Sequence, residues 1–230
     1  MRPTVLLFDI DGTLVTTGGA GRRAIERAFG AIFGRPDACN HVAFDGMTDR
    51  AIARAGLEAI SVEPTEETID AFLARYVACL EAEVQTADAS RYRVHAGMND
   101  AIAAGLKRGM AVGLGTGNIR EGARVKLERV GIFHRFAFGG FGDDHELRAE
   151  LIRVGARRGV ERLGVERESA RVVVIGDTPK DVAAAVAIGA ECVGVGTGSW
   201  SADRLLEHGA TAAFENLAAP GALAAVLGPG

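Results

Sequence analysis

Two acidic residues follow the first apolar segment of the chain. Val5 to Phe8 is apolar, and the sequence continues Asp9-Ile10-Asp11-Gly12-Thr13. The glycine permits a sharp turn, so both carboxylates are expected just beyond the end of a buried strand. Acids at such a position also serve as turn residues, and this pair alone does not define a site.

A second acidic pair follows another apolar segment far along the chain. Val174 and Ile175 precede Gly176-Asp177-Thr178-Pro179-Lys180-Asp181. Asp181 stands where a helix should begin, a position that itself favours an acid. Three carboxylates gathered at one sheet edge would repel one another unless a cation held them, and oxygen donors of this kind suit Mg²⁺. The sequence therefore predicts a magnesium site.

A glycine-rich segment and an isolated arginine are the candidates for binding an anion. Thr116, Gly117 and Asn118 lie between an expected strand and helix, where a hydroxyl and backbone N–H groups can hold a phosphate. Arg148 is interesting only because a phosphate site needs a fixed cation. An ordinary strand-to-helix turn would also explain the glycine-rich segment, and an isolated arginine is usually a solvated surface charge.

Short apolar segments alternating with helical patterns must position these groups. This rhythm predicts an α/β fold, a Rossmann-like parallel sheet with helices on both faces. The expected strands are Thr4–Phe8, Met110–Leu114, Ala137–Phe138, Arg171–Ile175, Cys192–Val195 and Thr211–Phe214.

One region lacks this alternation of strands and helices. From Gly18 to Glu83 only helical patterns occur, and a polar linker, Gln85 to Arg93, follows. We therefore expect a discontinuous core of residues 1–16 and 92–230 and a helical domain of residues 17–91. The insert leaves the sheet at its ligand-binding edge. Its candidates for contacting substrate, which are equally compatible with solvated helix ends, are Arg22, Arg23, Thr48 and Asp49.

Composition excludes several classes of protein. The chain has 230 residues, 48% of them hydrophobic, and a net charge of -4, which disfavours nucleic acid as a partner. Its 3 cysteines are far apart, which disfavours a disulfide framework. No apolar segment approaches the roughly 20 residues of a membrane span, so a cytoplasmic protein without a membrane partner is expected.

The four motifs in this order resemble the haloacid dehalogenase-like hydrolase superfamily over essentially the whole chain. The inserted helices resemble its C1-type cap, and the phosphoglycolate-phosphatase-like members are the most similar. The third motif of that superfamily usually carries lysine; Arg148 takes that place here, and Lys180 is the other candidate.

The resemblance implies a mechanism. Asp9 would attack phosphorus, and Asp11 would protonate the leaving alcohol and then deprotonate water. Mg²⁺ would be held by the Asp9 carboxylate, the Asp11 carbonyl and Asp177, with Asp181 supporting its water shell. Thr116, Gly117, Asn118 and Arg148 would bind phosphate. The expected function is Mg²⁺-dependent hydrolysis of a small phosphorylated metabolite through an aspartyl-phosphate.

Three alternatives stay open at this stage. In the dehalogenase branch the residue two after the nucleophile is not an acid, so Asp11 favours phosphoester chemistry. A sugar-phosphate mutase shares both acids and the cap. A phospho-accepting receiver module also uses a parallel sheet and Mg²⁺, but the Asp9–Asp11 spacing and the helical insert argue against it.

Overall fold

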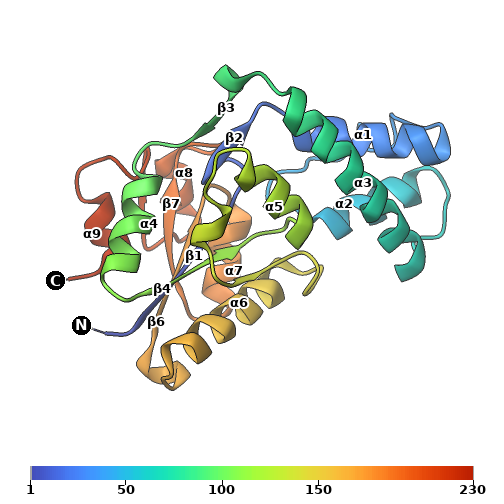
Figure 1. Ribbon diagram of the computed structural model, residues 1–230. Helices are drawn as coiled ribbons and strands as arrows, with labels where there is room; N and C mark the ends of the chain where they lie inside the picture. Colours follow the sequence, from blue (N-terminus) through green and yellow to red (C-terminus); the bar gives the residue numbers. More distant parts are fainter. Residues whose placement is uncertain (1, 230) are drawn as a thin grey trace.

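A six-stranded parallel sheet forms the centre of the protein, as seen in a computed structural model that describes residues 2–229 (Figure 1). Its strand order is β5-β4-β1-β6-β7-β8. The strands are β1 (Thr4–Phe8), β4 (Ala111–Gly115), β5 (Gly139–Gly140), β6 (Arg171–Gly176), β7 (Glu191–Val195) and β8 (Ala212–Phe214). The predicted α/β fold is confirmed.

The central strand β1 is apolar on both sides because helices cover both faces of the sheet. Leu6 and Phe8 point to one face, and Val5 and Leu7 point to the other; all four are fully buried. The first face is covered by α4 (Met98–Lys107), α5 (Arg120–Glu128) and α9 (Ala222–Leu227). The second is covered by α6 (Arg148–Leu163), α7 (Pro179–Ala187) and α8 (Ala202–Glu207). Short 3₁₀ helices are η1 (Ala89–Arg91), η2 (Phe133–Arg135) and η3 (Arg167–Ser169).

The register of the three central strands decides where the polar residues gather. Phe8 of β1 pairs with Leu114 of β4 and with Ile175 of β6. The residues just beyond these strands, Asp9 and Asp177 among them, therefore emerge side by side at the carboxyl edge.

The inserted region forms a three-helix cap, which lies at the right of Figure 1 beside α5. Its helices are α1 (Ala20–Phe33), α2 (Asp49–Ala59) and α3 (Glu66–Thr86). They enclose their own apolar core, in which the rings of Phe29 and Phe72 lie 4.2 Å apart between centroids. Ile119 and Val125 from the sheet domain also pack into this core, so the cap is seated on α5.

A small antiparallel ladder flanks the cap. β2 (Val15–Thr17) leads into it and β3 (Tyr92–Val94) leads out, and the two strands pair with each other. Sequence patterns did not indicate either strand, because each has three residues and contains polar side chains.

The expected strand at Ala137–Phe138 is wrong by two residues, since β5 is formed by Gly139 and Gly140. A Cβ at Gly140 would lie 1.9 Å from the carbonyl oxygen of Leu151 in α6, so only glycine fits there. The apolar Phe138 instead packs into the core that contains Leu151. The other expected strands shift by at most one residue at an end.

Candidate active site

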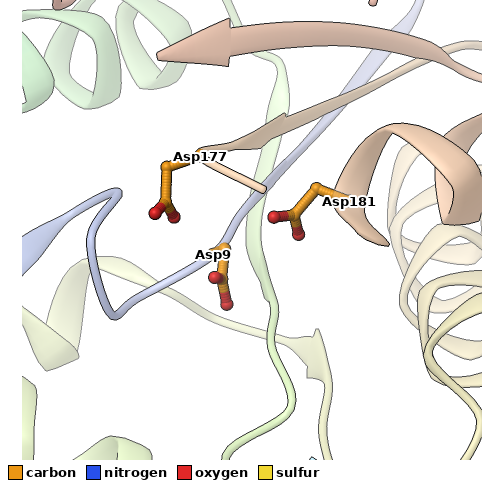
Figure 2. Close-up of side chains that lie close together, drawn as sticks. All are labelled: Asp9, Asp177 and Asp181. Atoms are coloured by element: carbon orange, nitrogen blue, oxygen red, sulfur yellow. The ribbon is translucent and has the colours of Figure 1, made fainter. Parts of the chain in front are cut away.

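Three buried carboxylates meet at the carboxyl edge of the sheet. Asp9 follows β1, Asp177 follows β6, and Asp181 lies in the first turn of α7. Figure 2 shows the three side chains gathered at this edge of the sheet, and one oxygen from each lies within 4.8 Å of the others. The residues are between 0% and 5% exposed. Asp9 and Asp177 were expected as metal ligands and Asp181 as a support for them, whereas the Asp11 carboxylate, from the same motif as Asp9, is not part of this group.

Local helix chemistry fixes Asp181. The chain begins α7 with Thr178 as the cap and Pro179 at the first position, where a missing N–H does no harm. Asp181 Oδ2 accepts hydrogen bonds from the backbone N–H of Thr178 at 3.1 Å and from its hydroxyl at 2.7 Å. This reciprocal cap leaves Oδ1 of Asp181 free for Arg148, whose Nε donates to it at 2.9 Å.

Arg148 is the cation of this cluster. It lies at the start of α6, and its Nη2 is 2.9 Å from Asp9 Oδ1 and 2.6 Å from Asp181 Oδ1. Its Nη1 donates to the carbonyl of Gly46 in the cap at 3.3 Å. Nη2 is fully buried and, despite these short distances, is aligned for no hydrogen bond with either carboxylate. Lys180, the other candidate for this role, is exposed.

The electrostatics of the cluster favour a bound cation. Burial raises the pKa of Asp9 to about 6, against the opposing effect of Arg148. Burial, together with the neighbouring Asp181 and Asp9, raises the pKa of Asp177 well above its usual range. Three acids with one arginine leave excess negative charge when ionised, and a divalent ion would relieve it. All-carboxylate donors fit Mg²⁺, Mn²⁺ or Ca²⁺.

Asp11 belongs to a separate polar group. Its Oδ2 accepts from Nζ of Lys126 at 2.6 Å and from Nδ2 of Asn118 at 2.8 Å. Lys126 also donates to Oδ1 of Asn118 at 2.6 Å. The hydroxyl oxygen of Thr116 accepts from the Asn118 backbone N–H at 3.2 Å and from its Nδ2 at 2.9 Å. Sequence reasoning singled out Asp11, Thr116 and Asn118 but missed Lys126.

The turn after Asp11 packs closely against Asp177. Gly12 has φ +79°, a conformation that side chains of L-residues rarely adopt. A Cβ there would lie 2.3 Å from Asp177 Oδ2. The hydroxyl of Thr13 donates to Asp177 Oδ1 at 2.7 Å, and that of Thr197 donates to the Gly12 carbonyl at 2.5 Å. Sequence reasoning missed Thr13 and Thr197 as supports of the site.

A cavity of about 320 Å³ lies between this edge of the sheet and the cap. Its walls combine the charged groups described above with apolar and polar cap residues. The core contributes Asp9, Asp11, Asn118, Lys126, Arg148 and Asp177, and the cap contributes Arg22, Ile25, Phe44, Asp49, Ile52 and Tyr76.

Two of the four cap candidates line the cavity. The Arg22 guanidinium lies 3.8 Å from the Phe44 ring centroid and donates to the carbonyl of Val42. Asp49 is buried, and its Oδ2 accepts from the Ile119 N–H at 2.9 Å. Burial raises the pKa of Asp49 to about 7.

The other two cap candidates make contacts away from the cavity. Arg23 forms an ion pair with Glu83 at 2.7 Å. Thr48 caps α2, and its hydroxyl donates to the carbonyl of Glu146 at 3.0 Å.

Fold and site together define a capped α/β protein with an acidic centre at the carboxyl edge of its sheet. Residues 3–189 match the haloacid dehalogenase-like hydrolase family, and the chain belongs to this family. The C1-type position of the cap, between β1 and β4, agrees with the resemblance of the motifs. No curated protein matches the chain.

Several solved structures share the fold at low sequence identity. CbbY from Rhodobacter sphaeroides, in complex with phosphate, is 18% identical with TM-score 0.70 over 95% of this chain and 96% of that one. A predicted phosphoglycolate phosphatase from Haemophilus somnus is 16% identical with TM-score 0.66 over 95% and 96%. A predicted phosphatase from Clostridium acetobutylicum is 18% identical with TM-score 0.63 over 93% of each chain.

None of the helices described in residues 2–229 is long and apolar enough to cross a membrane.

Proposed function

We propose that the protein is a Mg²⁺-dependent phosphatase that hydrolyses a small phosphomonoester through an aspartyl-phosphate on Asp9. The observation that carries this proposal is the meeting of Asp9, Asp177, Asp181 and Arg148 at a cavity between the sheet edge and the cap. Such a site combines a carboxylate nucleophile, donors for a divalent ion and a cation for phosphate. The structural neighbours, among them a predicted phosphatase and a protein in complex with phosphate, are in keeping with it.

The reaction would proceed in two steps. A carboxylate oxygen of Asp9 attacks phosphorus while the bond from phosphorus to the ester oxygen breaks, and Asp11 gives that oxygen a proton. Asp11 then takes a proton from a water that attacks the phosphoryl group, and inorganic phosphate leaves Asp9. The 43% exposed side chain of Asp11 opens onto the cavity, as proton transfer to a bound ester requires.

The ion would be held by the carboxylates of Asp9 and Asp177 and the backbone carbonyl of Asp11, with Asp181 supporting its water shell. When bound, Mg²⁺ would neutralise charge on the phosphoryl oxygens. Arg148 would hold a phosphate oxygen through its unsatisfied Nη2. Thr116, Gly117 and Asn118 would bind the phosphate from the neighbouring loop.

The cap would choose the leaving group. A cavity of about 320 Å³ accommodates a small metabolite, and its cap wall offers the guanidinium of Arg22 and the carboxyl of Asp49. Arg23 and Thr48 would support the cap, through the ion pair with Glu83 and as the cap of α2, without contacting the substrate. We propose residues 17–91 as the specificity domain and residues 1–16 and 92–230 as the catalytic domain. Phosphoglycolate is the first substrate to test, because one structural neighbour is a predicted phosphoglycolate phosphatase.

A panel of small phosphate esters, assayed for phosphate release with Mg²⁺ and with a chelator, tests this proposal. We expect Mg²⁺-dependent turnover in the wild type and none in Asp9→Asn. Asp100→Asn, which changes an exposed aspartate of α4, serves as the matched control and should keep full activity. Turnover by Asp9→Asn, or undiminished turnover in chelator, would overturn it. With a sugar bisphosphate, an isomerised monophosphate in place of free phosphate would indicate a mutase.

A further inference from the structure

Lys126 lies within a closed ring of polar contacts. It comes from the last turn of α5 and is 3% exposed. Its Nζ donates to Asp11 Oδ2 and to Asn118 Oδ1, each at 2.6 Å, while Asn118 Nδ2 donates to the same Asp11 oxygen at 2.8 Å. Each member of the ring therefore contacts the other two.

Structural stability is a poor explanation for this lysine. Its chain neighbours Val125 and Leu127 are buried in apolar clusters, so this turn of α5 does not face solvent and needs no charge on that account. Burying an ammonium group is costly, and a buried ion pair is often no more stabilising than an apolar replacement. Phosphate binding explains it no better, because Arg148 already provides the cation beside Asp9.

The cap approaches Nζ closely at Gly21. A Cβ on Gly21 of α1 would lie 3.3 Å from Nζ and 4.0 Å from the Tyr76 hydroxyl. The charged and titratable groups around the ammonium are Asp11 on the turn after β1, Asp49 on α2 and Tyr76 on α3. Only Asp11 forms a hydrogen bond with it among these.

We propose that Lys126 is a positioning residue for Asp11, which deepens and rests on the phosphatase function proposed above. Two donors, Lys126 and Asn118, fix Oδ2 of Asp11, whereas Oδ1 makes no hydrogen bond with any residue in the described part of the chain. Oδ1 is thereby the atom that delivers a proton to the ester oxygen as its bond to phosphorus breaks. Without Lys126, the half-exposed carboxylate loses its orientation.

The test compares leaving groups that differ in their need for that proton. Nitrophenolate leaves phosphorus unprotonated, whereas an alkyl alkoxide does not. In Lys126→Met we expect kcat/KM for an alkyl phosphate to fall about 100-fold or more, the usual contribution of a general acid. For 4-nitrophenyl phosphate kcat/KM should fall less than about 10-fold, with a burst of one nitrophenolate per enzyme, because the later attack of water still needs Asp11.

Two further variants control for charge and for folding. Lys126→Arg retains a cation and should restore part of the alkyl phosphate activity. Lys107→Met changes an exposed lysine of α4 and should match the wild type for both substrates. Equal losses of kcat/KM for the two substrates in Lys126→Met, or a raised KM with unchanged kcat, would overturn the proposal.

A crystal structure of Lys126→Met separates this proposal from the proposed function. If the wild type hydrolyses no phosphate ester, the proposed function fails. The positioning role is then judged by the Asp11 side chain alone. In Lys126→Met the Asp11 carboxylate should be rotated away from the orientation described here. A carboxylate in the same orientation as in the wild type would refute the role of Lys126.

Discussion

Replacing Gly12 by alanine should reduce the catalytic rate strongly and the stability of the fold only slightly. The added Cβ would lie 2.3 Å from Asp177 Oδ2 and 2.8 Å from its Cγ, distances that no carbon atom tolerates. Thr197 and the short turn to Val15 hold the Gly12 backbone, so Asp177 is the group that must move. A displacement of about 1 Å in a catalytic group can reduce the rate about 100-fold.

The stability change should be much smaller. Gly12 has φ +79°, and a side chain in the left-handed region costs about 1–2 kcal/mol. For a chain of this length, that corresponds to a fall of about 2–8 °C in Tm. Gly109 is the matched control, because it has φ +70° and nothing within 4 Å of its hypothetical Cβ.

Both variants should therefore lose similar amounts of thermal stability, but only Gly12→Ala should lose activity. Phosphate release under Mg²⁺ saturation and thermal unfolding followed by circular dichroism give the two quantities. Activity of Gly12→Ala within about threefold of wild type would refute the reasoning, since a threefold change is far below the 100-fold loss worked out above. An equal loss in Gly109→Ala would show that backbone strain, not contact with Asp177, is responsible.

Further substitutions probe the charges around the site. Arg148 lowers the pKa of Asp9, and Arg148→Met removes this effect. The acidic limb of the profile of kcat/KM against pH should therefore move to higher pH in Arg148→Met. In Arg148→Lys, which retains a cation, the acidic limb should stay near its wild-type position. Burial raises the pKa of Asp49 from 3.8, its value in an unfolded chain, to about 7 in the folded protein. The ionised carboxylate therefore destabilises the fold progressively as pH rises from about 4 to 7. Asp49→Asn should stabilise the protein by up to about 4 kcal/mol in denaturant titrations at pH 8, and it should have no effect at pH 3.5. Arg54 of the cap pairs with Glu146 of the core at 2.9 Å, and Glu146→Gln should lower the free energy of unfolding by about 0.2–1 kcal/mol at low ionic strength, with a smaller effect at about 1 M salt; a salt-independent loss would contradict this.

The sheet and its acidic edge could be predicted because both follow from local sequence. An apolar run that ends in aspartate marks a buried parallel strand, and the carboxyl ends of such strands meet. Asp9 and Asp177, 168 positions apart in the chain, are close for this reason. The strand at Gly139–Gly140 could not be found this way, because close approach of α6 selects glycine there, and glycine carries no apolar signal.

Lys126 shows the other limit of sequence patterns. A lysine between Val125 and Leu127 is indistinguishable from a solvated helix residue until the fold places it beside Asp11. The rarity of lysine in this chain was one signal, because only three of its 26 lysine and arginine residues are lysines. In a chain that so strongly prefers arginine, a lysine next to small and apolar helix residues suggests a position where a compact cation is required.

The ladder of β2 and β3 has a consequence for how the chain assembles. The strands before and after the three cap helices pair with each other, with Val15 opposite Val94. The chain therefore enters and leaves the cap at neighbouring positions. The 74 residues between β2 and β3 then form one insert whose two ends lie together, and the neighbours β1 and β4 need not close a long flexible loop before they pair. The helices of such an insert can be exchanged without breaking the sheet, provided that the new cap keeps its contacts with the edge, such as the Gly46 carbonyl that accepts from Arg148.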